Sequence, residues 1–238
     1  QLRIRGLRAH GSPRALEADI DITWPKGRAP KASASFSLVD VSVTTLAQMV
    51  GLERMDLQGT ASFKGSASLD RGASVTGEFI IRNAARGALS LGTITGELEY
   101  SDRAALIRRA RIVGPVAKGE FSAKIPAADD YELQADLASL EAAALGQALG
   151  QPRLTGRFPA SIRASGSFRE ARASGRISLG PGQMQGRAFE SATASFALST
   201  ARARLSDVSV RLPRGSYQGG VEITGWAAGA RQAALTGH

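Results

Sequence analysis

The stretch MDLQGTASFKGSASL, from Met55 to Leu69, decides the fold of this chain. Its apolar residues alternate with polar ones, at Leu57, Ala61, Phe63, Ala67 and Leu69. Because successive side chains of a strand point to opposite faces, this pattern predicts a β-strand with one apolar and one polar face. The same alternation recurs from ALEADIDITW (residues 15–24) to YQGGVEI (residues 217–223). Most connections are too short for a crossover helix, so we expect an all-β antiparallel meander.

Two segments break the alternation, residues 43–51 and 140–150. Each places apolar residues at roughly helical spacing and ends in Gly, as helices tend to do. We expect each segment to form a short helix that opens a repeat. Its apolar side would lie on the sheet or close one end of it.

The second half of the chain repeats the first. FSLVDVSVTTLAQMVG (residues 36–51) aligns without gaps with ADLASLEAAALGQALG (residues 135–150), and GEFSAKI (residues 119–125) corresponds to GSYQGGV (residues 215–221). The spacing falls from 99 residues at the first pair to 96 at the last. Such a chain uses its length to build a surface rather than a single pocket. We expect one continuous β-segment over 1–238, divided into the end of a preceding repeat (1–35), repeat 1 (36–134), repeat 2 (135–225) and a tail or the start of a further repeat (226–238).

Composition argues against catalysis. The chain has no Cys, which excludes disulfides, thiol catalysis and Cys-ligated metals, and its two histidines, His10 and His238, lie near the chain ends. Acidic residues fall on polar faces or in turns, where they do not suggest a general-acid pair. We therefore expect no enzymatic activity, no cofactor and no metal site. The sequence has no signal peptide or membrane-spanning stretch and starts with Gln1, so we expect a segment of a longer protein.

The net charge of +9 comes from 30 Lys and Arg against 21 Asp and Glu. Nucleic acid is disfavoured as a partner because the arginines are dispersed and the few aromatic residues lie in the apolar phase. Two interpretations stay open. The arginines solvate the polar face and guard strand edges, or they attract anionic lipid headgroups.

Glycine also recurs at apolar-phase positions, which are Gly59, Gly65, Gly77, Gly96, Gly156, Gly166 and Gly175. Because interior strand glycines often mark bends, their recurrence beside aromatic residues predicts a sheet curled along its length. Small residues would then stand where the walls come close. Ordinary bulges in a sandwich are the alternative.

A family resemblance rests on LAQMVGL (residues 46–52), the stretch from Met55, SVTGEFIIRN (residues 74–83) and GTITGELEY (residues 92–100). This succession resembles the bacterial AsmA-like superfamily of TamB-type proteins, in which a helix precedes a unit of the form L-x-G-x-h-x-h-x-G, with h apolar. The resemblance covers roughly residues 36–225. It implies a long antiparallel sheet bent into a taco-shaped groove with an apolar interior. It also implies an inner-membrane anchor, a periplasmic location, movement of phospholipid toward the outer membrane, and an outer-membrane protein partner.

The sequence hypothesis is a periplasmic lipid-transfer segment whose groove solvates the acyl chains of phospholipids. Exposing acyl chains to water costs about 0.8 kcal/mol per CH₂, and an apolar lining without inward charges would let lipid slide. The alternative is a closed β-sandwich that serves as a structural or interaction module, because both folds need the same alternation. The residues expected to line the groove are Phe36, Leu57, Phe63, Leu69, Phe79, Ile94, Leu98, Phe121, Leu133, Leu154, Phe158, Ile162, Phe168, Ile177, Phe196, Tyr217 and Val221.

Overall fold

The computed structural model describes residues 1–9, 15–26, 30–49, 56–70, 72–87, 89–101, 104–126, 130–143, 156–167, 172–184, 186–199, 202–224 and 232–237. The chain divides into two compact units, unit 1 (Gln1–Pro115) and unit 2 (Val116–His238). The boundary between them falls inside the predicted repeat 1. Both units are antiparallel sheets, so the prediction of an all-β meander is confirmed.

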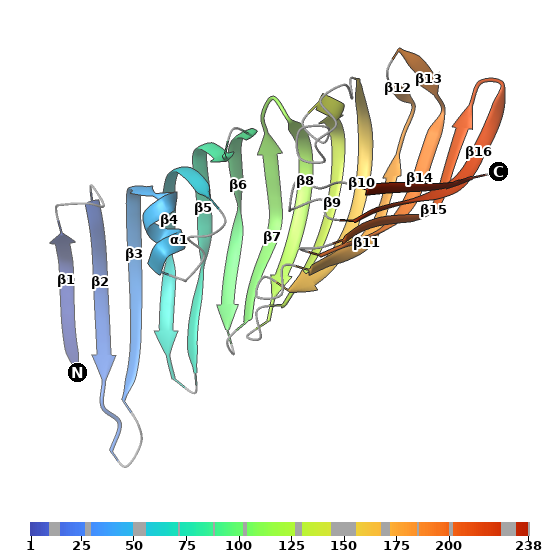
Figure 1. Ribbon diagram of the computed structural model, residues 1–238. Helices are drawn as coiled ribbons and strands as arrows, with labels where there is room; N and C mark the ends of the chain where they lie inside the picture. Colours follow the sequence, from blue (N-terminus) through green and yellow to red (C-terminus); the bar gives the residue numbers. More distant parts are fainter. Residues whose placement is uncertain are drawn as a thin grey trace. The chain divides into compact units, whose positions relative to one another are not determined.

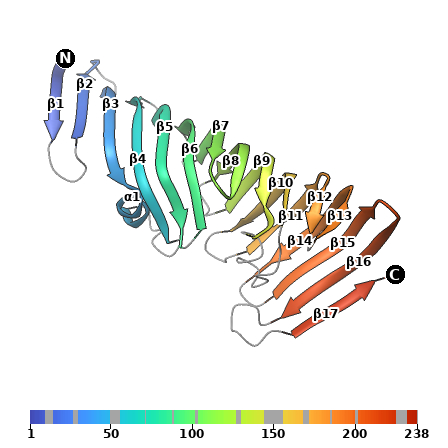
Figure 2. The same cartoon turned by 90° about the horizontal axis from the view of Figure 1, so that it is seen from above.

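The described elements of unit 1 are β1 (Leu2–Ala9), β2 (Ala15–Thr23), β3 (Lys31–Ser42), α1 (Val43–Met49), β4 (Leu57–Leu69), β5 (Ala73–Arg86), β6 (Leu89–Ser101) and β7 (Ala104–Val113). The strands are hydrogen-bonded in chain order from β1 to β7 (Figure 1). The helix α1 lies on one side of this sheet (Figure 2) and contacts β3 and β4. Thr44 Oγ1 donates a hydrogen bond of 2.9 Å to the carbonyl of Leu57, which ties α1 to the start of β4. The first predicted helix is confirmed over residues 43–49.

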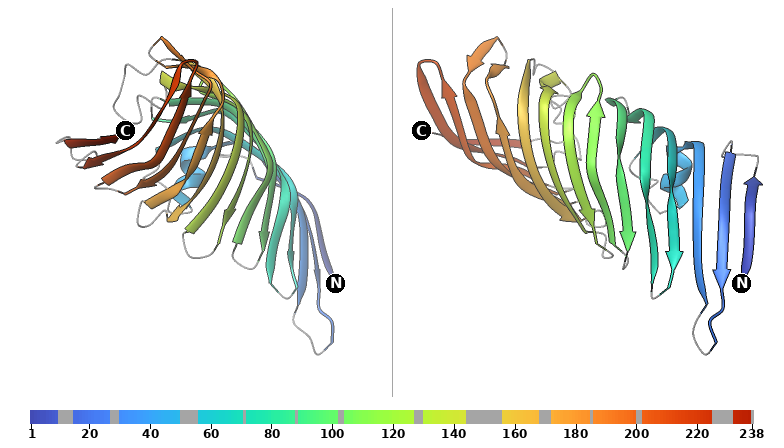
Figure 3. Two further views of the ribbon diagram at one scale, coloured as in Figure 1. Left: turned by 90° about the vertical axis from the view of Figure 1, so that its right-hand side faces the viewer. Right: turned by 180° about the vertical axis from the view of Figure 1, so that it is seen from behind.

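The described elements of unit 2 are β8 (Ala117–Ile125), β9 (Asp130–Glu141), β10 (Arg157–Ser167), β11 (Arg172–Leu179), β12 (Gly182–Met184), β13 (Arg187–Phe189), β14 (Ser191–Leu198), β15 (Arg202–Leu212), β16 (Gly215–Thr224) and β17 (Gln232–Gly237). The long strands again pair in chain order, while β12 and β13 pair only with each other, as a short orange ribbon at one end of the strands (Figures 1 and 3).

The second predicted helix begins too early. Leu140 lies in β9, where it is buried and pairs with Ala117 and Phe158. Because Leu140 pairs with residues of both β8 and β10 and its side chain is buried there, β9 continues past it to Glu141. Ala142 and Ala143 are helical, as predicted, and the part of this prediction from residue 144 to residue 150 lies outside the described residues.

Each unit presents an open sheet rather than a sandwich. In the described part of each unit, the only second sheet is the β12–β13 ribbon of unit 2, which is far smaller than the sheet beside it. The sandwich alternative requires two large sheets packed face to face. The described strands do not provide the second one.

Bulges correct the phase of the alternation. Strict alternation from Ile107 along β7 would place Arg109 and Arg111 on the apolar face. Instead Arg109 adopts a left-handed backbone (φ 46°) and the register with β6 shifts. Ala110 and Ile112 then face inward, with 0% and 8% of their surface exposed. A bulge thus keeps two guanidinium groups off the apolar side.

The same correction occurs in repeat 2. The register between β6 and β7 shifts between Thr95 and Glu97, and the register between β14 and β15 shifts between Thr193 and Ser195. Asp207 of β15 has φ 52°, as Arg109 has φ 46° in β7. The aligned strands β3 and β9 also begin and end 99 residues apart. The two copies therefore share a bulge as well as a sequence pattern.

Asn83 provides a test of these bulges. It has φ 52° in β5, at a register shift toward β6, and its side chain is exposed. We expect Asn83→Val to lower the free energy of unfolding by about 1–2 kcal/mol, because a branched side chain is strained in the left-handed region. Asn83→Gly removes the same amide but fits that backbone, and should retain stability in urea denaturation. Equal losses in both variants would contradict a left-handed residue at this position.

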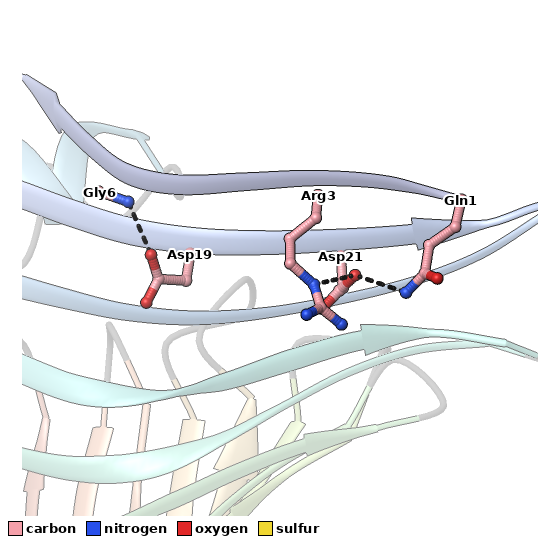
Figure 4. A network of polar contacts seen from close by, with 5 residues as sticks. All are labelled: Gln1, Arg3, Gly6, Asp19 and Asp21. Carbon is pink, nitrogen blue, oxygen red and sulfur yellow. Dashed lines mark hydrogen bonds and ion pairs between the residues drawn. The ribbon is translucent and has the colours of Figure 1, made fainter.

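A network of polar contacts joins β1 and β2 on the charged face of the sheet (Figure 4). Arg3 Nε donates hydrogen bonds to both Asp21 oxygens, at 3.1 and 2.9 Å, and Gln1 Nε2 donates to Asp21 Oδ1 at 3.3 Å. At the neighbouring bulge, Gly6 has φ 63° and its N–H donates to Asp19 Oδ1 at 2.7 Å. The Asp19 carboxylate thus accepts a hydrogen bond from a backbone N–H at the point where the β1–β2 register shifts.

The Arg3 hydrogen bond lowers the pKa of Asp21 from its ordinary value. The pair therefore stabilises the fold above the unfolded-state pKa of Asp21, and this contribution is lost as pH falls through the lower folded-state pKa. We expect Arg3→Gln to raise the Asp21 pKa toward its ordinary value in an NMR titration of the carboxyl carbon. Arg8→Gln, which removes the separate Arg8–Glu17 pair, should leave the Asp21 pKa unchanged. If Arg3→Gln also left it unchanged, the cause assigned here would be wrong.

Candidate functional site: an uncovered apolar face

The apolar residues of unit 1 line up across its strands. Cross-strand partners share a face, so a chain of partners traces a row over the sheet. One row crosses β1 to β7 and consists of Leu7, Ala18, Phe36, Gly65, Gly77, Leu98 and Ile107. Parallel rows consist of Leu16, Leu38, Phe63, Phe79 and Gly96, and of Val41, Ala61, Ile81, Ile94 and Ile112. These three rows contain no charged residue.

The glycines of unit 1 make room for phenylalanine rings. A Cβ added at Gly65 or Gly77 would lie 2.7 Å from the ring of Phe63. A Cβ at Gly96 would lie 2.9 Å from the ring of Phe79. The sequence suggested that small residues mark close approach of two walls. The structure shows two neighbours at these positions: the backbone carbonyls of Thr76 and Lys64 on the paired strand approach Gly65 and Gly77 most closely, and the ring of Phe63 lies across both glycines, as in aromatic rescue.

The rings also contact each other along the face. Phe36 of β3 and Phe63 of β4 stack with ring centroids 5.4 Å apart and an interplanar angle of 26°. Phe36, Phe63 and Leu98 are half-buried although no second sheet of unit 1 is described over them. Neighbours on the same face therefore supply much of their burial.

Unit 2 has an apolar face of the same kind. One row runs through Ala123, Leu133, Ala164, Gly175, Phe196, Leu205 and Val221. Its neighbours run through Phe121, Ala135, Ile162, Ile177 and Ala194, and through Gly119, Leu137, Ala160, Leu179, Ala192, Val210 and Tyr217. Charged residues are absent from these three rows.

At one end of unit 2 the ribbon covers this face. Phe189 of β13 packs edge-on against Phe158 of β10, with ring centroids 5.8 Å apart. Phe158 is only 2% exposed, so it is not open to a ligand. The ribbon is held beside β15 by Glu190, whose N–H donates to the carbonyl of Arg211 at 2.8 Å.

The structure places the predicted lining residues as two sets. The unit 1 set lies on the apolar phase of β3 to β6 and consists of Phe36, Leu57, Phe63, Leu69, Phe79, Ile94 and Leu98. The unit 2 set lies on β8 to β16 and consists of Phe121, Leu133, Phe158, Ile162, Ile177, Phe196, Tyr217 and Val221. Leu154 and Phe168 lie outside the described residues.

Several buried members of these faces were not among the residues expected to line the groove. The most buried apolar residues are mainly alanines, and they include Ala18, Ala61, Ala84, Ala110, Ala117, Ala135, Ala160, Ala194 and Ala203. Their phase within the alternation could have identified most of them. Val41, Ala110 and Ile112 could not be found by phase, because each follows a residue at which the register shifts.

The opposite faces carry the charges. In unit 1, Arg3 pairs with Asp21, Arg108 with Glu99 and Arg109 with Glu97, at 2.9 to 3.3 Å. All three pairs are solvent-exposed, and such pairs add little stability. The charged groups keep this face of the sheet hydrated.

No family model, curated protein or solved structure matches the chain. None of the described helices is long and apolar enough to cross a membrane. Within the described ranges, no group of three or more His, Asp or Glu side chains is placed to hold a metal ion.

Proposed function

We propose that the chain is a non-catalytic lipid-transfer segment of a bacterial envelope protein, and that its apolar faces solvate phospholipid acyl chains. The observation that carries this proposal is the uncharged row that crosses β1 to β7, with two shorter uncharged rows beside it. Strands about 4.8 Å apart give such a row a length of roughly 29 Å. An acyl chain along it would turn one side away from water over its whole length, and full enclosure of the chain would gain about 0.8 kcal/mol for each CH₂.

The face suits movement of lipid better than tight retention. Phe, Leu, Ile, Ala and Gly side chains offer similar contacts along a row, and the rows traced above contain no charged group to hold a lipid at one position. We propose further that each sheet curls around its apolar face to form a groove. The half-burial of Phe36 and Leu98 in a single sheet supports this.

The cellular setting belongs to the same proposal. The helix followed by β4, β5 and β6 carries the motif that resembles the AsmA-like superfamily. On that basis the segment belongs to the periplasmic part of an inner-membrane-anchored protein. Its path would lead phospholipid toward the outer membrane, where an outer-membrane protein would receive it.

Native mass spectrometry tests the proposal. The chain is purified gently from a bacterial envelope, and bound lipid is identified after extraction. The expected result is phospholipid that leaves the protein on addition of a competing detergent. A folded chain free of lipid, including after incubation with phosphatidylethanolamine, would overturn the proposal and favour a protein-interaction module.

A further inference from the structure

Two arginines face each other on the polar side of unit 2. Arg163 of β10 and Arg176 of β11 are direct cross-strand partners, and both are exposed. Like charges in such positions, with Cβ atoms about 5 Å apart, destabilise a sheet. Among the described residues, neither guanidinium has a hydrogen bond or an ion pair. A pair of this kind is stabilised when an anion binds between the two groups.

Repeat 1 shows that the fold does not need these arginines. The aligned residues Leu38 and Leu137 pair with Phe63 and Ala160, so the position of Arg163 corresponds to that of Ser66. Ser66 pairs with Thr76, and their hydroxyl oxygens are 3.2 Å apart. One repeat therefore has a neutral hydrogen-bonded pair where the other has two unpaired positive charges.

The polar face next to the arginine pair is hollowed. Ser165 and Ser174 are partners in the adjoining row, which continues through Ala197 to Arg204. These four residues line a shallow hollow of about 700 Å³. Arg172 and Arg202 line its far side. Hydroxyl groups thus lie between two sets of guanidinium groups.

The charge is uneven across this hollow. Asp130 and Glu132 line it on the β9 side, while Arg172, Arg202 and Arg204 line it on β11 and β15. Arg202 Nε is also 3.1 Å from Glu222 Oε1, and the other N–H groups of the Arg202 guanidinium can donate to another acceptor. An anion held between Arg163 of β10 and Arg176 of β11 would border this hollow on the side of Ser165 and Ser174.

We infer that Arg163 and Arg176, together with Ser165 and Ser174 at the near side of the adjoining hollow, bind a phosphate group. Guanidinium forks bind phosphate oxygens in a bidentate manner, and the serine hydroxyls supply further donors. The ligand is a phosphate ester or free phosphate. The site lies on the face opposite the apolar rows, so it does not depend on the proposed lipid-transfer function.

A titration of the whole chain with inorganic phosphate tests the site. The Nε–Hε signals of arginine are followed by NMR at low ionic strength, with chloride as the control anion. Saturable shifts are expected at Arg163 and Arg176. The double variant Arg163→Ser with Arg176→Thr, which installs the repeat 1 pair, should weaken binding about tenfold or more, because it removes charge-assisted hydrogen bonds. Arg8→Ser on the polar face of unit 1 should leave the affinity unchanged.

A second pattern of NMR shifts would overturn the site. Non-saturating shifts of similar size at Arg8 and at other exposed arginines, unaffected by the double variant, would show general screening and overturn the site. Sedimentation with vesicles then identifies the source of the phosphate. If the chain sediments with mixed phosphatidylcholine and phosphatidylglycerol vesicles, and the double variant does not, the ligand is a lipid headgroup. If phosphate titrates the site but neither protein sediments, the ligand is a soluble phosphate.

Discussion

Replacing Leu69 and Tyr217 together by aspartate is expected to reduce bound phospholipid at least tenfold. Leu69 lies on the apolar phase of β4 and is 51% exposed, and Tyr217 lies on the apolar row of unit 2 and is 38% exposed. Because both side chains are already accessible to water, the charges should cost little stability. They should, however, place a carboxylate against any acyl chain on each face, where burial of an unpaired charge is strongly unfavourable.

The matched control is Val113→Asp. Val113 is 47% exposed, close to the value for Leu69, but it lies opposite Thr93 on the polar face of unit 1. This variant should keep its lipid in the same native mass spectrometry experiment. Undiminished lipid in a folded Leu69→Asp, Tyr217→Asp chain would exclude the apolar faces as the binding surface. Equal lipid loss in all the variants would point to a general effect of added charge.

Replacing Gly96 by alanine is expected to lower the free energy of unfolding by about 2 kcal/mol. The new methyl would lie 2.9 Å from the ring of Phe79 and 3.0 Å from Cβ of Ala110. A Gly to Ala change that fits the backbone would instead add about 0.4–1 kcal/mol through the unfolded chain. The sign of the change in urea denaturation therefore reports whether the space above the glycine is occupied, and the partner variant below separates the ring from Ala110.

Phe79→Leu supplies the partner for a double-mutant cycle. A leucine lacks the distal ring atom that meets Gly96, so the double variant should recover about 1 kcal/mol relative to the sum of the single changes. Additive losses would mean that Phe79 does not occupy the space above Gly96. Contact with Ala110 would then be the main cost of the alanine.

The motif from Met55 contained most of the information needed for β4. Its alternation correctly separates Phe63 and Ala67 from Lys64 and Ser66, because a strand has a fixed period of two. The same reasoning fails beyond a bulge, and Arg109 shows why. A single left-handed residue reverses the phase for the rest of the strand, and nothing in the local composition of RRARIV announces it.

Glycine positions illustrate a second limit. Sequence shows that Gly65 and Gly77 stand in the apolar phase, but it cannot show that they are cross-strand partners beneath one ring. That relation depends on the register between β4 and β5. Similarly, the sequence predicts that Phe158 is an accessible lining residue. In the structure, Phe189 of the β12–β13 ribbon packs against it and covers it.

The sequence by itself determined that this protein is an antiparallel meander with one apolar and one polar face, because side-chain alternation and connection length are local properties. The tertiary structure alone decided which residues share a row, where bulges restore the phase, and that Arg163 stands beside Arg176. These relations join residues far apart in the chain, and they follow from backbone hydrogen-bond register, which local composition does not encode.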